Sequence, residues 1–154
     1  MTITVARHAT MDAQPDVVQH VLSDIGAYAD WAEGIQTVDI LTAGAHDQPE
    51  QARFVFDSPL GPLSAVLAFT RGDDGIASEL VEGDMLATFD AHYRVAESND
   101  GGSVVHATLT VAVTTPMVPA VMVKSYADQM LERLMTSLAE RCAHLEKGSP
   151  DGAK

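Results

Sequence analysis

The sequence predicts an α+β fold in which a seven-stranded antiparallel sheet is covered by one long C-terminal helix. Three observations support this prediction. Seven segments alternate apolar and polar residues, short turns join six of them, and a final segment has helical periodicity. The chain has 154 residues, of which 46% are hydrophobic and 20% charged, which indicates one globular domain. We assign residues 1–147 to this domain and residues 148–154 to a flexible tail.

The N-terminal part predicts one strand followed by two short helices. Apolar and polar residues alternate over residues 3–11, which is typical of a half-buried strand. Pro15 suits the first turn of a helix whose apolar face extends to Leu22. Ser23 then offers a helix cap, and a second short helix or turn follows over residues 26–31.

Six further strands follow, separated by turns rich in Gly, Pro, Asp and Asn. Short turns of this kind join antiparallel neighbours, because parallel neighbours would need crossover helices. The predicted strands cover residues 35–41, 52–56, 63–70, 76–81, 86–96 and 104–113.

The C-terminal segment predicts one long amphipathic helix that ends at Gly148. Charged residues occupy much of its other surface. Its apolar residues recur at helical spacing as Val118, Met122, Tyr126, Met130, Leu134, Leu138, Cys142 and Leu145.

One helix is too narrow to cover such a sheet. A helix of this length is about 40 Å long and about 10 Å across, whereas seven strands spaced about 4.8 Å apart are about three times wider. Large side chains must therefore fill the remaining space, or a ligand cavity stays open. Four small residues share the inward parity, which favours a cavity; they are Ala65, Ala87, Ala91 and Ala107.

The charge balance disfavours several partners. Nine Lys and Arg against 22 Asp and Glu give a net charge of −13, so we expect no nucleic-acid binding.

The longest apolar stretch, residues 117–123, is too short to span a bilayer, and the N-terminus lacks a secretory pattern. Cys142 is the single cysteine and cannot form an intramolecular disulfide. We therefore expect a cytoplasmic protein without stable membrane insertion.

Three passages resemble the START-like superfamily, also called SRPBCC, which includes the birch pollen allergen. They are residues 11–18, 23–31 and the hairpin 79–84, which continues through 89–95. Bacterial proteins of the polyketide cyclase/dehydrase and lipid-transport group are the most similar. The resemblance implies the helix-grip fold over about residues 3–146 and a cavity for a hydrophobic molecule. Two positions depart from the pattern, because relatives typically have glycine at Ala91 and often tryptophan at Ser78.

Aromatic and apolar side chains are the candidate ligand contacts. The resemblance places Tyr28 and Trp31 at the cavity mouth, although each could instead be a packing anchor. Tyr93 and Tyr126 could donate a hydrogen bond to a ligand oxygen, or bond the backbone as buried tyrosines commonly do. The complete predicted set is Tyr28, Trp31, Phe54, Phe56, Phe69, Phe89, Tyr93, Ala107, Met122, Tyr126 and Met130.

Charged and metal-binding candidates are few. Arg7 has inward parity on the first strand, so we expect it to be paired, to face a ligand or, preferably, to lie at the solvated strand end. His8, His92 and His106 have outward parity, and their spacing matches no metal motif. No phosphate-binding loop indicates a nucleotide cofactor, and no catalytic residue can be assigned.

We predict a binding module or carrier for a lipid, quinone or polyketide-like molecule. The alternative is a polyketide aromatase/cyclase or dehydratase acting in the same cavity, with Tyr93, Tyr126 or Arg7 assisting. A third interpretation is a regulatory partner of a biosynthetic enzyme. A homodimer or a complex with such an enzyme is compatible with the sequence.

Overall fold

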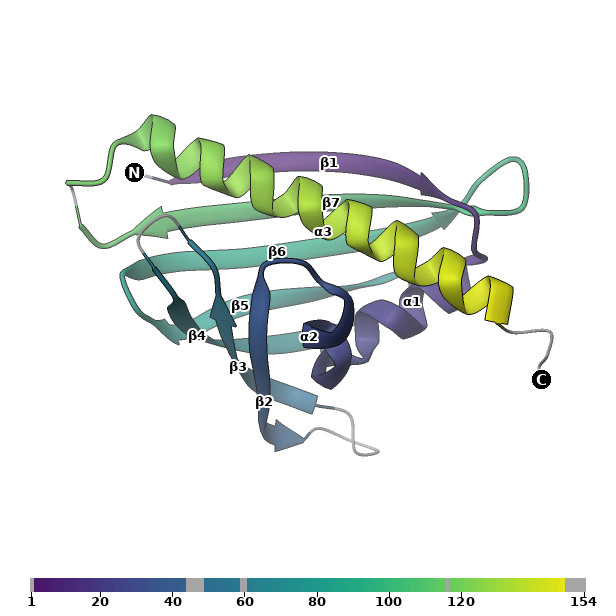
Figure 1. The fold of residues 1–154 in the computed structure, drawn as a ribbon, viewed down its shortest axis with the longest axis horizontal. Coiled ribbons are helices and arrows are strands. Elements are labelled where there is room, and N and C mark those ends of the chain that lie inside the picture. The colour runs from purple at the N-terminus through teal and green to yellow at the C-terminus, as the bar shows by residue number, and fades with distance from the viewer. Residues whose placement is uncertain (1, 44–48, 59–60, 116, 149–154) are drawn as a thin grey trace.

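Seven strands form one antiparallel sheet in the computed structural model, which describes residues 2–43, 49–58, 61–115 and 117–148 (Figure 1). The strand order is β1-β7-β6-β5-β4-β3-β2, so hairpins join consecutive strands from β2 to β7, and the first strand pairs with the last. The predicted sheet is confirmed. Its strands are β1 (Ile3–Met11), β2 (Ile35–Ala43), β3 (Pro49–Phe56), β4 (Leu63–Arg71), β5 (Gly75–Gly83), β6 (Leu86–Glu97) and β7 (Ser103–Val113).

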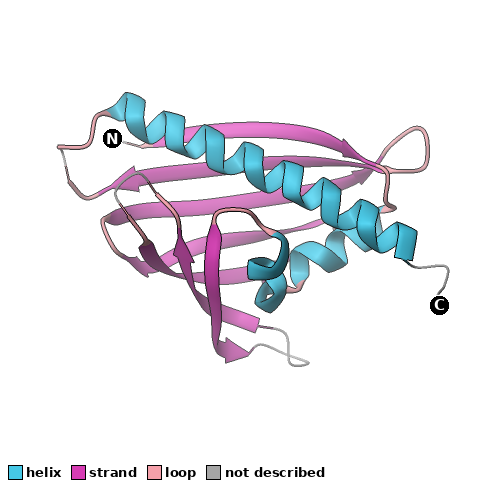
Figure 2. Ribbon diagram, in the orientation of Figure 1, coloured by secondary structure: helices cyan, strands magenta, loops and turns pink. Residues whose placement is uncertain are grey.

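A long helix crosses one face of the sheet, and short helices lie at one end of it (Figure 2). The long helix is α3 (Ala120–Gly148), and the short ones are α1 (Pro15–Ser23), the 3-10 turn η1 (Ile25–Ala27) and α2 (Tyr28–Trp31). Pro15 occupies the first turn of α1, as predicted. The predicted tail lies outside the described residues from 149 onward.

The buried face of α3 is rotated by about one residue from the predicted stripe. In the N-terminal half of α3, Val123 and Leu131 are buried against the sheet, whereas Met122 is 42% exposed; farther along, Leu138 and Cys142 are buried as predicted. A spacing of four residues drifts about 40° per step around a helix of 3.6 residues per turn, so the predicted stripe leaves the sheet at its N-terminal end.

A β-bulge changes which side chains of β6 face inward. The pairing of β6 with β7 shifts register between Leu86 and Thr88, and the extra residue reverses the alternation. Leu86 is therefore buried and Ala87 exposed, so the prediction that Ala87 faces the cavity is wrong. The other three small residues, Ala65, Ala91 and Ala107, are buried as expected.

Candidate functional site

An apolar cavity lies between α3 and the concave face of the sheet. Its walls come from α2, the turn before β2, strands β2 to β7 and the middle of α3. The helix is narrower than the sheet, as expected, and the cavity lies in the part of the sheet face that the helix does not cover. The lining residues are Tyr28, Glu33, Ile35, Phe54, Phe56, Leu67, Phe69, Ser78, Phe89, Ala91, Tyr93, Leu109, Met130, Leu131 and Leu134.

Phenylalanine rings occupy much of one wall. Phe54 stacks on Phe56 with ring centroids 5.6 Å apart, and Phe56 lies 5.0 Å from Phe89. Phe69 packs against Phe54 at 5.8 Å. The cavity between these rings and α3 is narrow, because the space open to the centre of a water molecule is about 50 Å³. A ligand larger than a few waters therefore requires the aromatic side chains or α3 to move.

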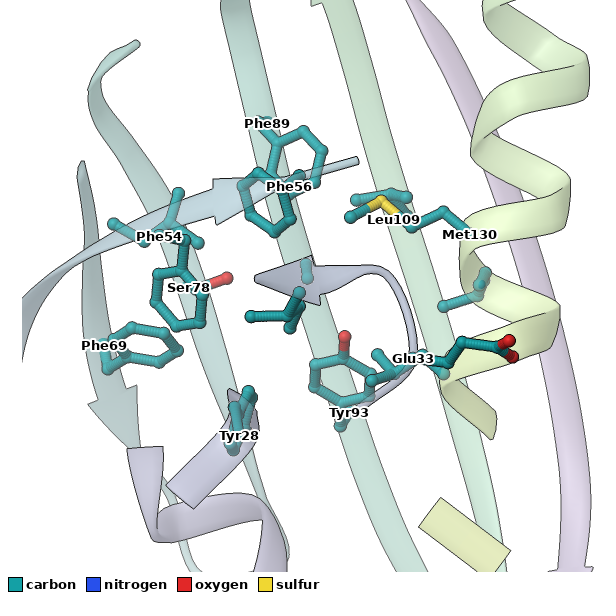
Figure 3. Close-up of a pocket in the computed structure, with 15 residues that line it drawn as sticks. Tyr28, Glu33, Phe54, Phe56, Phe69, Ser78, Phe89, Tyr93, Leu109 and Met130 are labelled. Carbon is teal, nitrogen blue, oxygen red and sulfur yellow. The ribbon is translucent and has the colours of Figure 1, made fainter. Parts of the chain in front are cut away.

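Two hydroxyl groups point into this apolar space. Ser78 on β5 and Tyr93 on β6 are only 6% and 8% exposed, and their oxygens are directed between the phenylalanine wall and α3 (Figure 3). No hydrogen bond joins either hydroxyl to another described residue. Burial raises the pKa of Tyr93, so its hydroxyl keeps its proton and can act as a donor. Neither oxygen is enclosed by protein atoms, so both are open to a hydrogen bond with a ligand oxygen in the cavity.

Tyr28 contributes its ring but not its hydroxyl. The hydroxyl donates a hydrogen bond to the carbonyl of Leu22, in the last turn of α1, where helix carbonyls lack partners within the helix. Burial raises the pKa of Tyr28, and the neighbouring Tyr93 raises it further, whereas Arg71 lowers it. Tyr28 is therefore a structural donor with one aromatic face on the cavity.

The mouth of the cavity lies between the α2–β2 turn and α3. Glu33 and Ile35 form one side of it, and Met130 and Leu134 form the other. The backbone N–H of Glu33 donates to the Oγ of Ser137 at 3.3 Å, which connects the turn to the helix. The carboxylate of Glu33 lies beside α3, away from the phenylalanine wall (Figure 3).

Many of the predicted ligand residues line this cavity. They come from α2, β3, β4, β6 and α3, which are distant in the sequence. The residues are Tyr28, Phe54, Phe56, Phe69, Phe89, Tyr93 and Met130.

Trp31 and Ala107 do not line it. The Trp31 ring contacts the edge of Tyr28 at 5.1 Å but turns outward, where it lines a separate groove with Arg141. Ala107 is only 1% exposed and belongs to the packed core, because β7 lies close beneath α3. Both residues therefore pack behind the cavity lining and do not face the cavity.

Met122 and Tyr126 lie beyond the cavity, nearer the N-terminal end of α3. Both line a small separate pocket beside Leu86. The Tyr126 hydroxyl donates to the backbone carbonyl of Asp57 at 3.1 Å, which connects α3 to the end of β3. Mainly because of burial, the pKa of Tyr126 is raised to about 12.

The sequence reasoning missed Ser78 as a cavity residue. Ser78 has the same inward parity on β5 as Ile76, and this signal would have placed it in the wall. Ser78 pairs directly with Ala91 across β5 and β6. The two positions that depart from the family pattern are therefore neighbours in the cavity wall.

Arg7 lies in the middle of β1 and not at a strand end. Its Nη2 is 3.6 Å from Oε1 of Glu132 on α3, so it is paired and does not line the cavity. This differs from the strand-end placement that we preferred, because α3 packs against β1 and supplies the carboxylate.

The histidines lie on the outer face of the sheet. His8 pairs with His106 with ring centroids 5.9 Å apart, and His92 is aligned with Thr108. Within the described part of the chain, no three His, Cys, Asp or Glu residues are placed to hold a metal ion. In the same part, no helix is long and apolar enough to cross a membrane.

Comparison with known proteins gives a family and a fold. The family model described as polyketide cyclase / dehydrase and lipid transport matches residues 2–143. No curated protein matches the sequence.

Solved structures with the same fold include a START superfamily protein from Mycobacterium smegmatis. It is 24% identical, with a TM-score of 0.85 over 92% of this chain and 98% of that one. The Zhui aromatase/cyclase from Streptomyces sp. R1128 is 15% identical, with a TM-score of 0.88 over 97% of this chain and 99% of that one. A protein from Thermus thermophilus is 16% identical, with a TM-score of 0.82 over 92% and 98% of the two chains. At these identities the likeness shows the fold alone.

Proposed function

Because the chain belongs to the polyketide cyclase / dehydrase and lipid transport family, we propose that it is a binding module or carrier for a hydrophobic small molecule held between the sheet and α3. One observation carries the proposal. Two hydroxyls without protein partners among the described residues, those of Ser78 and Tyr93, point into an otherwise apolar cavity. Apolar burial would supply most of the binding free energy, and the hydroxyls would orient a ligand oxygen.

The ligand class that fits is a lipid, quinone or polyketide-like molecule with an apolar body and one oxygen at its inner end. The phenylalanine wall offers flat contact surfaces. Binding would open the narrow cavity, and Met130 at the mouth has an adaptable side chain for this movement.

Binding is favoured over catalysis by the chemistry of the lining. Glu33 is the one carboxylate among the described lining residues, and it is exposed at the mouth. The raised pKa of Tyr93 makes its hydroxyl a hydrogen-bond donor and a poor general base. A cyclase or dehydratase in the same cavity would have to use the hydroxyls of Tyr93 and Ser78 as donors that stabilise an enolate.

Native mass spectrometry tests the proposal. The protein is incubated with pooled fatty acids, sterols, quinones and aromatic polyketides, and retained masses identify ligands. Ala91→Leu adds a larger side chain inside the cavity, and Ala96→Leu adds the same side chain outside the cavity lining on the same strand. We expect Ala91→Leu to abolish retention and Ala96→Leu to preserve it. No retained ligand in any pool, or equal retention by both variants, would refute the proposal, whereas a released product of altered mass would indicate catalysis.

A further inference from the structure

A second, polar groove lies along α3 beside the cavity, because Gln129 and Arg133 of the groove directly precede Met130 and Leu134 of the cavity lining. Its volume is about 330 Å³. The groove lies between α3 and the end of β3. It is lined by Asp57, Ser58, Tyr126, Gln129, Glu132 and Arg133.

Arg133 stands at the junction of the groove and the cavity. A side chain at Gly34 would place its Cβ 3.3 Å from the Nη2 of Arg133. The guanidinium therefore lies against the α2–β2 turn. Both neighbours of that glycine, Glu33 and Ile35, line the cavity. On α3, Leu134 follows Arg133 directly and also lines the cavity. A molecule leaving the cavity through its mouth would therefore meet this guanidinium.

The hydrogen-bonding capacity of Arg133 is unused in the described structure. The Nε atom is buried without a hydrogen-bond partner, and no described carboxylate forms an ion pair with Arg133. The acidic residues of the groove have other partners. Glu132 pairs with Arg7, and Oδ1 of Asp57 accepts a hydrogen bond from Gln36. A buried N–H without an acceptor is costly, and the Nη atoms, which are not enclosed, are open to an acceptor from a ligand.

We propose that Arg133 binds the carboxylate of an amphiphilic ligand whose apolar body fills the cavity and whose inner oxygen meets Ser78 and Tyr93. This inference rests on the proposed function and names the class of its ligand. A planar guanidinium binds a carboxylate through two parallel hydrogen bonds, which a hydroxyl or ester cannot match. The Gln129 amide lines the same groove; its nitrogen donates one N–H to the Oγ of Ser125 at 3.2 Å and has a second N–H for a ligand.

The negative charge around the groove makes the binding of an acid depend on Arg133. The protein carries a net charge of −13, and Glu33 and Asp57 flank the route of the carboxylate. Without Arg133 these charges would repel an acid, while a neutral alcohol of the same length would be unaffected. The prediction is therefore a selective loss of acid binding.

The test compares dodecanoic acid with dodecanol by isothermal titration calorimetry on the full chain, because these two probes share one apolar chain and differ only in the head group that would meet Arg133. We expect the wild type to bind the acid about tenfold more tightly, which corresponds to about 1.4 kcal/mol. Arg133→Gln should remove this preference and leave dodecanol affinity unchanged, and Arg133→Lys should retain part of it. Arg141→Gln is the matched control, because Arg141 lines a different groove.

The outcomes separate this inference from the proposed function. Equal affinity of the wild type for acid and alcohol, or an equal loss of both in Arg133→Gln, would overturn the carboxylate site alone. Failure of both compounds to bind, together with no retained ligand in the pools, would refute hydrophobic binding itself. Circular dichroism of each variant establishes whether it is folded. If Arg133→Gln does not fold, the acid preference of Arg133→Lys is compared with that of the wild type instead.

Discussion

Removing the hydroxyl from Tyr93 and from Tyr28 should have opposite effects on stability, although both rings are buried in the same core. The Tyr28 hydroxyl donates to the Leu22 carbonyl at the end of α1. Tyr28→Phe leaves that carbonyl without a partner, which costs about 1–3 kcal/mol. The Tyr93 hydroxyl has no protein partner among the described residues, so Tyr93→Phe removes only an unpaired polar atom. We expect it to leave stability unchanged or to raise it by up to about 1 kcal/mol.

Thermal unfolding followed by circular dichroism measures the difference. For a chain of this size, 1 kcal/mol corresponds to about 2–4 °C in Tm. Tyr28→Phe should therefore lower Tm by about 2–12 °C, and Tyr93→Phe should not lower it. If Tyr93→Phe lowers Tm as much as Tyr28→Phe, the Tyr93 hydroxyl is bonded within the fold and is not available to a ligand. In that case the assignment of Tyr93 as the ligand donor fails.

Three further predictions follow from the packing. Leu131→Ala should cost about 2–5 kcal/mol in urea unfolding, whereas Met122→Ala on the exposed face should change stability by less than about 0.5 kcal/mol; similar losses would contradict the orientation of α3. Gly75→Ala should destabilise the fold by about 1–3 kcal/mol, because the added Cβ would lie 1.8 Å from the Tyr93 carbonyl oxygen, and an unchanged Tm would refute this close approach. All three tyrosine pKa values are raised in the fold, so the folded state holds its phenolic protons more tightly than the unfolded state. The tyrosine contribution to stability should be constant up to about pH 10 and then fall by up to about 1.4 kcal/mol per pH unit for each tyrosine, and a pH-independent Tm from about pH 9 to 11 would contradict this.

Local patterns in the chain were enough to predict the secondary structure and the family. Alternation of apolar and polar residues located each strand to within a few residues, because period-two patterning follows directly from the geometry of a half-buried strand. The long helix and its end at Gly148 followed from helical periodicity and a terminating glycine. The phenylalanine wall was also predicted, since Phe54, Phe56 and Phe89 lie on inward positions of their strands.

The size of the cavity and the polar groups that reach it depend on how the segments pack together. The register of β5 against β6 places Ser78 beside Ala91, and the bulge at Ala87 turns that residue outward. The rotation of α3 exposes Met122 and brings Arg133 to the mouth, next to Gly34. Periodicity belongs to each segment alone, whereas cavity volume and unpaired polar atoms depend on contacts between segments far apart in the chain. The fold could therefore be inferred from local patterns, and the site required the packing of the whole sheet against the helix.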